Sequence, residues 1–334
     1  MGTTGMTEPA APPIATAPAV KPAASGRFAL VDLARGIALL AMFVFHFAYD
    51  LSNAGLIETD IAFEPGWRWF ARCIAGSFLV LVGVSLVLAT RRGLNRTAFL
   101  RRLAMVSAAA LLVTIGTVFA MPANFIFFGI LHHVAVASVL ALPFLRLPLA
   151  GVIVAAAIVF ALPFWVASPL LDQPWAAWLG FSRLPLQTAD FVPVFPWFGC
   201  VLSGIALARL ALPRLADGPL AAWRPHTLAA RIVAWGGRHS LLVYLVHQPV
   251  FIGLIMLAAQ IMPAQPREES RFLTDCQVSC VRANGDATLC REACGCTIEG
   301  LKRENLWQKA IGSELSADET TRMSRLAQAC LRGP

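Results

Sequence analysis

Long apolar segments alternate with short polar connections from residue 30 to residue 262. Seven of these segments are long enough, at about 20 residues each, to cross a bilayer as α-helices. They are residues 30–51, 67–90, 100–120, 125–145, 147–166, 192–210 and 240–262. Membrane barrels use alternating strands of roughly ten residues, which these segments do not match. The pattern predicts an all-α fold, a polytopic membrane helix bundle with about seven transmembrane helices.

The two ends of the chain have a different character. Residues 1–26 are rich in Ala, Pro and Thr, which predicts a disordered tail. Residues 263–334 are polar and hold six of the eight cysteines. We therefore expect three parts: the tail, a transmembrane domain over residues 27–262, and a small Cys-rich helical domain over residues 263–334.

Composition and charge support a membrane protein and indicate its orientation. The chain is 57% hydrophobic and 14% charged, with a mean hydropathy of +0.67, which is too apolar for a soluble domain of 334 residues. Arginines concentrate in the connections after the second and sixth segments, whereas the first connection carries Glu58, Asp60 and Glu64. The positive-inside rule then places the N-terminus in the cytoplasm and the C-terminus outside. Attraction to anionic membrane lipids explains the net charge of +8 better than nucleic acid does.

The cysteines of the C-terminal segment predict disulfides. Cys276 and Cys280, like Cys290 and Cys294, lie four residues apart, as on one face of a short helix. Two antiparallel helices would allow Cys276–Cys294 and Cys280–Cys290, leaving Cys296 for Cys330, although six cysteines permit fifteen pairings. Zinc is the competing interpretation, but the spacing differs from that of zinc ribbons and the segment has no His, so no metal is expected. Ser316 and Glu319 have the spacing of a capping box that starts a last helix.

Four ionisable residues in the first apolar segment predict a site. Asp32, Arg35, His46 and Asp50 fall within an arc of roughly 60° on one helical face. Charged groups inside a bilayer are costly unless they are paired or face a polar cavity. Arg35 and His46 are about 16 Å apart along the helix, which nearly connects the two membrane surfaces. The alternatives are an arginine that anchors the helix to headgroups and a His–Asp pair that only ties helices together.

Three further polar clusters lie in the apolar segments. His132 and His133 point about 100° apart, so at most one of them is expected to face a cavity lined by the first helix. His247 and Gln248 precede Pro249, and their alternative role is to satisfy the carbonyl that the proline frees. Asp190 is expected near the outer surface, with Trp197 about two turns deeper. A carboxylate beside an aromatic ring suits a sugar, but a tryptophan at this depth is also typical of the aromatic belt at a membrane interface.

The residues resemble a known family. The stretches RGIALLAMFVFHFAYDL, FFGILHHVA, DFVPVFPWFGCVLSGI and GRHSLLVYLVHQPV are similar to bacterial proteins related to the heparan-alpha-glucosaminide N-acetyltransferase catalytic domain, over about residues 27–260. The spacing of Arg35 and His46 is also typical of the wider transmembrane acyltransferase superfamily, in which the His is implicated in acyl transfer. The Cys-rich segment lies outside this resemblance.

The resemblance implies an enzyme of a bacterial inner membrane that moves an acetyl or other short acyl group from cytoplasmic acetyl-CoA to an acceptor outside. Arg35, paired with Asp32, would contact CoA. His46 would take a proton or carry the acyl group, and Asp50 would accept the other ring N–H of His46. The candidate acceptor-binding residues are His132, Asp190, Trp197, His247 and Gln248.

The acceptor itself is expected to be an amino sugar or hydroxyl of an envelope glycan or glycolipid, and a homodimer is compatible with the sequence. Two other function classes fit the same pattern. A transporter or flippase of an envelope precursor would also place charges along a membrane pathway. A non-catalytic envelope assembly protein would act through the Cys-rich segment and need no CoA site.

Overall fold

The computed structural model describes Gly2 and residues 28–57, 59, 61–62, 64–166, 169–182, 186, 188–215, 223–261, 267–312 and 315–332. The rest of the predicted N-terminal tail, and Glu58 and Asp60 of the first connection, lie outside these residues. Helices dominate the described chain, and its β-type pairing is one isolated bridge between Phe128 and Phe191. The predicted all-α class is confirmed.

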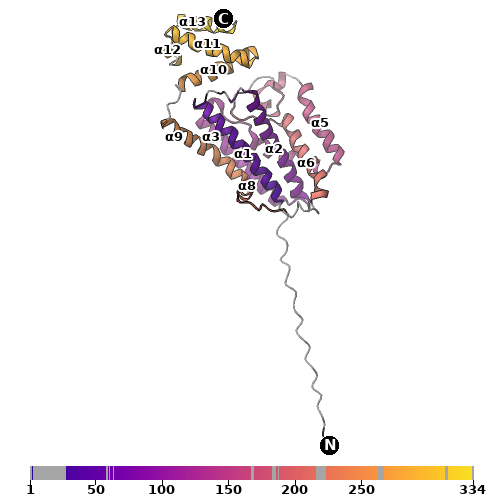
Figure 1. The fold of residues 1–334 in the computed structure, drawn as a ribbon. Coiled ribbons are helices and arrows are strands. Elements are labelled where there is room, and N and C mark those ends of the chain that lie inside the picture. Colours follow the sequence, from indigo (N-terminus) through magenta and orange to yellow (C-terminus); the bar gives the residue numbers. More distant parts are fainter. Residues whose placement is uncertain are drawn as a thin grey trace.

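Five helices of the described chain are long and apolar enough to cross a membrane. They are α1 (Ala29–Asn53), α2 (Pro65–Thr90), α3 (Arg96–Ala120), α6 (Val194–Leu215) and α9 (Ser240–Ile261). Two shorter apolar helices, α4 (Ile130–Leu140) and α5 (Leu149–Trp165), occupy the fourth and fifth predicted segments. Each predicted transmembrane segment therefore contains a helix, and together these helices form one bundle (Figure 1).

The fourth predicted segment is the one whose helix is much shorter than expected. The 3₁₀ turns Pro122–Asn124 and Pro143–Leu145 flank the 11 residues of α4. Residues 125–129 are not helical because their backbone bonds to the chain that enters α6: the Val192 N–H donates to the Phe128 carbonyl at 3.2 Å. At the other end, Arg209 of α6 donates to the carbonyls of Phe144 and Leu145. Non-helical backbone inside a membrane protein needs such internal partners.

Helices α2 and α6 pack with their backbones in contact. A Cβ added at Gly83 would lie 2.1 Å from the Val201 carbonyl oxygen, and one at Gly204 would lie 2.1 Å from that of Val80. Small residues allow this close approach where helices pack in a membrane. The surrounding core includes Leu79, Leu86, Val152, Val201, Leu202 and Ile205.

Helix α8 (Leu228–Arg238) of the bundle was not predicted. It lies in the Arg-rich connection before α9 and packs against the first turns of α1. A Cβ at Gly237 would lie 1.8 Å from the Asp32 carbonyl oxygen, and one at Gly36 would lie 2.0 Å from that of Val233. We call the end of the bundle where α1 begins the lower end, as it appears in Figure 1, and the opposite end the upper end.

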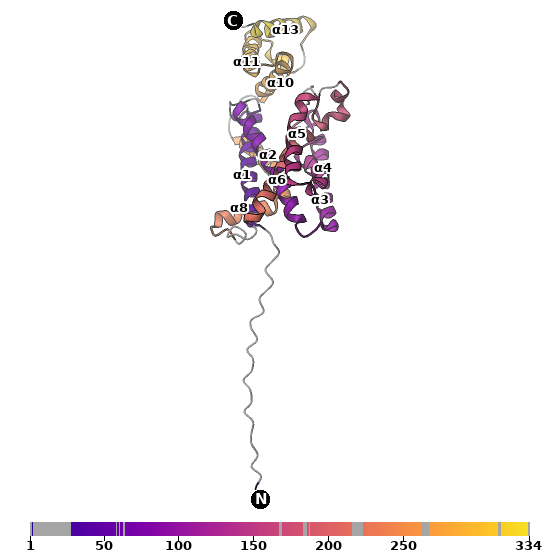
Figure 2. The ribbon, with the colours of Figure 1, turned by 90° about the vertical axis from the view of Figure 1, so that its right-hand side faces the viewer.

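The C-terminal helices form a small unit beyond the upper end (Figure 2). They are α10 (Arg267–Asn284), α11 (Ala287–Arg303), α12 (Trp307–Ile311) and α13 (Ala317–Leu331). Disulfides join Cys276 to Cys294, Cys280 to Cys290 and Cys296 to Cys330, the pairing that antiparallel helices predict. The Ser316–Glu319 capping box is also present. An ion pair of 3.8 Å between Arg291 and Glu64 links this unit to the start of α2.

Candidate active site

Arg35 and Asp32 form an ion pair at the lower end of α1. The Arg35 guanidinium lies 3.2 Å from Asp32 Oδ1 and also donates to the hydroxyl of Ser85 on α2. Asp32 is 5% exposed, so its charge needs these partners. Its second oxygen lies 3.8 Å from Nε of Arg238, at the end of α8. The predicted pairing of Asp32 with Arg35 is therefore present, and two more helices contribute to it.

A third arginine completes this lower cluster. The Arg102 guanidinium, near the start of α3, is close enough to Arg35 for like-charge repulsion. The lower cluster thus has Arg35 and Arg238 at the Asp32 carboxylate and the Ser85 hydroxyl at Arg35, and Arg102 adds a third positive charge near Arg35. Excess positive charge with planar guanidinium donors suits a phosphate-bearing ligand. Sequence reasoning missed Ser85, Arg102 and Arg238 as site residues, because a serine in an apolar helix and arginines in a connection do not reveal which face they occupy.

A second cluster, the histidine pair, lies farther up α1. The rings of His46 on α1 and His247 on α9 are 5.0 Å apart between centroids, in an edge-to-face arrangement. Phe43, one turn below His46, stacks on His247 at 5.6 Å. His247 is buried and His46 is half-buried. The structure therefore joins a predicted catalytic residue to one that was predicted only to bind the acceptor.

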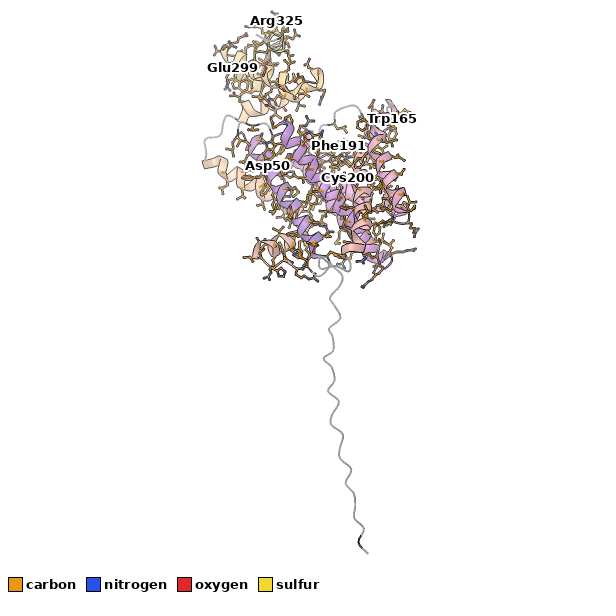
Figure 3. All side chains as sticks on the ribbon, turned by 45° about the vertical axis from the view of Figure 1, so that its right-hand side comes forward. Asp50, Trp165, Phe191, Cys200, Glu299 and Arg325 are labelled. Carbon is orange, nitrogen blue, oxygen red and sulfur yellow. A yellow bond between two sulfur atoms is a disulfide. The ribbon has the colours of Figure 1, made fainter. Side chains whose placement is uncertain are left out.

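Asp50 has a different partner from the one expected. Both of its carboxylate oxygens accept from Nε2 of Gln248, at 2.9 Å each. The expected hydrogen bond from the His46 ring to Asp50 is not among the bonds of the described residues, because α9 presents the Gln248 amide to this carboxylate. Gln248 therefore bridges α9 to α1 instead of repairing the helix at Pro249. Figure 3 places Asp50 in the half of the bundle nearer to the C-terminal helices.

The His247 ring has a defined tautomer. Its Nδ1 lies 2.5 Å from the backbone carbonyl oxygen of Tyr244, one turn earlier in α9. A carbonyl oxygen only accepts, so Nδ1 carries the proton and Nε2 carries the lone pair. That Nε2 is buried and has no hydrogen-bond partner within the described part of the chain. The ring can therefore accept a proton from a group that enters the bundle.

His132 and His133 of α4 have separate environments. The Gly129 N–H donates to Nδ1 of His132 at 3.3 Å, and Nε2 of His132 lies 3.1 Å from the Thr114 hydroxyl. Both nitrogens of His132, the predicted acceptor-binding residue, are thus used within α3 and α4. His133 is 1% exposed, and its Nδ1 bonds to the carbonyls of Val192 and Pro193. These contacts place both rings in the packing around the entry to α6.

Asp190 and Trp197 are held by packing in this structure. Asp190 Oδ2 accepts from the N–H of Ile130 at 2.8 Å, which caps the start of α4. The absence of a side chain at Gly129 leaves room for this contact, because a Cβ at that position would lie 2.3 Å from the same oxygen. The Trp197 ring packs near Gly76 of α2. Contact of Asp190 and Trp197 with a sugar stays a prediction.

In the part of the chain that the structure describes, no group of three or more His, Cys, Asp and Glu side chains is arranged to hold a metal ion. What the bundle does contain is a cationic cluster at the lower end of α1 and a histidine pair farther along the same helix. The fold and these two clusters define the class: a polytopic helical membrane protein with polar chemistry buried in its bundle.

Comparison with known families gives a more specific assignment. A family model described as heparan-alpha-glucosaminide N-acetyltransferase, catalytic, matches residues 27–249. This match covers most of the chain, which therefore belongs to that membrane acetyltransferase family. It includes both polar clusters and ends before the disulfide-bonded helices α10 to α13. Searches of curated proteins and of solved structures gave no match.

Proposed function

We propose that this protein transfers an acetyl or other short acyl group from acyl-CoA in the cytoplasm to an amino sugar or hydroxyl of an envelope glycan or glycolipid on the other side. The observation that carries the proposal is the placement of two chemically different clusters on one helix, α1. Arg35 and His46 are about 16 Å apart along that helix, within reach of a pantetheine arm.

The lower cluster is the donor end of the site. Arg35, Arg102 and Arg238 supply guanidinium groups that suit the phosphates of CoA. Asp32 and Ser85 both accept from the Arg35 guanidinium and so fix its position at this end of α1. The positive-inside rule assigns this end to the cytoplasm, where acyl-CoA is made available.

The histidine pair is the transfer end of the site. His46 faces His247 across 5.0 Å, in a bundle interior that is largely apolar. There, an imidazole can meet the acyl carbonyl and the acceptor together. Gln248 holds Asp50 in place one turn above His46, which fixes α9 against α1.

The first test is acyl transfer by the purified protein. The chain in detergent would be incubated with labelled acetyl-CoA and envelope extract, and label would be followed in the acceptor fraction. His46→Ala should lower transfer by at least about a hundredfold at equal protein in the membrane, because either an acid–base group or a donor to the developing oxyanion typically contributes that much or more. His226→Ala, in an exposed connection, is the matched control.

Normal turnover by His46→Ala would overturn the role of His46. If the wild-type protein neither bound nor consumed acetyl-CoA, the acyltransferase proposal itself would fail, and a transporter or assembly protein would fit better. Profiling the glycans and metabolites of a deletion strain would then identify the acceptor, since the acetylated product should disappear.

A further inference from the structure

We propose that His247 is a second catalytic residue and that its Nε2 removes the proton from the attacking acceptor, while His46 handles the acyl group. This inference rests on the proposed acyl transfer and assigns the base within it. It also changes the role expected for His247 from the sequence, where the residue was only a candidate contact for the acceptor.

The first argument is the unpartnered nitrogen. Nδ1–H of His247 is committed to the Tyr244 carbonyl, so Nε2 is a buried lone-pair acceptor with no hydrogen-bond partner among the described residues. Buried polar atoms nearly always have a partner, because leaving one unpaired costs free energy. An acceptor hydroxyl or amine that enters this space would supply the missing donor. The proton of that hydroxyl or amine would then lie next to the lone pair of Nε2, which can accept it.

The second argument is that the ring is held in place. Phe43 stacks on one side of His247 at 5.6 Å, and the Phe251 ring meets it edge-on at 5.9 Å. The Tyr244 ring packs at 5.5 Å, and the His46 ring lies 5.0 Å away in an edge-to-face arrangement. A base held by packing on several sides is preorganised, which proton transfer at a defined distance requires.

A neighbouring acceptor atom indicates what kind of group enters. Nε2 of Gln248 is used by Asp50, and its Oε1 is buried with no hydrogen-bond partner among the described residues. Consecutive residues of a helix point about 100° apart, so Oε1 marks a second unfilled acceptor position on α9, separate from Nε2 of His247. A sugar, which carries several hydroxyl donors, would supply a donor to each position.

The reaction step then balances without another reagent. The acceptor nitrogen or oxygen attacks the thioester carbonyl carbon and gives its proton to Nε2 of His247. His46 hydrogen-bonds the carbonyl oxygen as negative charge develops on it. The C–S bond breaks, the CoA thiolate leaves, and the His247 imidazolium returns the proton to that sulfur. CoA thiol and the acylated acceptor are the products, and His247 is neutral again.

The test compares donor binding with transfer in full-length protein. His247→Gln should lower transfer about a hundred- to ten-thousand-fold, because glutamine keeps a polar side chain but cannot take a proton at neutral pH. Equilibrium binding of acetyl-CoA should stay unchanged, since the lower cluster is intact. Added imidazole should restore part of the transfer activity of His247→Ala. It should not restore the transfer activity of His46→Ala to the same extent. His226→Gln is the control.

The pH dependence of transfer gives a second measurement, which would not change if His247 had only a structural role. The acidic limb of the kcat/KM profile, which reports protonation of the base, should be present in the wild type and lost in His247→Gln. Normal transfer by His247→Gln would overturn this inference and leave the proposed acyl transfer intact. Loss of acetyl-CoA binding together with transfer in that variant, without rescue of His247→Ala by imidazole, would also overturn it. Absence of any acetyl-CoA binding by the wild type would instead remove the proposed function.

Discussion

The role of each polar residue in the bundle depends on the hydrogen-bond and ion-pair partners that it has there. Arg35 near the end of a span has the position of a headgroup anchor, yet it donates to both Asp32 and Ser85 inside the bundle. Asp190 has the position of a sugar ligand, yet it caps α4. Asp32, Asp50 and Asp190 each accept from a defined donor in the described bundle, which lowers the cost of placing a carboxylate in a membrane interior.

The substitution Arg35→Lys tests whether this single residue contributes to acetyl-CoA binding at the lower cluster. A lysine keeps the positive charge, but an ammonium cannot reproduce the planar fork that reaches Asp32 and Ser85 while presenting further N–H donors. The dissociation constant for acetyl-CoA should rise about tenfold or more, the cost of roughly one charge-assisted hydrogen bond. Equilibrium binding to protein in nanodiscs would measure it.

The control for this change is Arg231→Lys on the exposed side of α8, which should leave acetyl-CoA affinity as it is. Unaltered affinity in Arg35→Lys would mean that Arg35 only anchors α1 at the membrane surface.

At the scale of elements, disulfides and caps hold the C-terminal helices. Helices α10 and α11 are joined twice, by Cys276–Cys294 and Cys280–Cys290, and Cys296–Cys330 ties the end of α13 to α11. The apolar core of this unit is small and includes Ile298, Leu301, Leu306 and Trp307. Small domains with little core commonly depend on such cross-links.

The start of α13 should be sensitive to acid. The hydrogen bond from Lys309, and then those from the Ser316 N–H and hydroxyl, hold the pKa of Glu319 at about 2, below its ordinary value of 4.5. A carboxyl with a lowered pKa in the folded state stabilises it above the ordinary pKa, and that contribution is lost as pH falls from about 5 towards 2. We expect protection of the α13 amides, measured by hydrogen exchange and corrected for intrinsic rates, to fall across this range.

Glu319→Gln should show a smaller pH dependence of α13 protection than the wild type. Asp318→Asn removes a more exposed carboxylate from the same turn without cutting the capping box, and it should retain the wild-type response. Equal pH dependence in Glu319→Gln and the wild type would exclude the capping box as its source.

At the scale of the whole molecule, orientation links the chemistry to the compartments. The lower cluster and the Arg-rich connections lie at one end of the bundle, and the disulfide-bonded helices lie beyond the other (Figure 2). A donor from the cytoplasm and disulfides outside require the same orientation. The positive-inside rule and the disulfides thus predict the same orientation, which stays a prediction.

Reporter fusions test this orientation directly. A reporter that is active only outside the cytoplasm should be active when fused after Gln265 and inactive when fused after Gly93. The reverse result would place the disulfides in a reducing compartment and the lower cluster away from acyl-CoA, and the proposed reaction would then have its donor on the wrong side.

The sequence by itself was enough to predict the apolar segments, the shared face of α1 and the capping box, and it offered the observed disulfide pairing as one of fifteen that six cysteines permit. Apolar length, helical period and short spacings are local properties, so they do not depend on how the helices pack. The shortened α4 was not predictable in this way, because backbone bonds to the distant entry of α6 replace its first turns.

Tertiary structure decided which polar residues meet. Asp50 and Gln248 are 198 residues apart in the chain, and Arg35 and Ser85 are 50 apart. Whether such pairs form depends on the rotation and depth of each helix, which packing determines through contacts such as Gly36 and Gly237 between α1 and α8. The histidine pair, the donors around Asp32 and the free Nε2 of His247 exist only because α1, α2, α3, α8 and α9 are brought together at these angles.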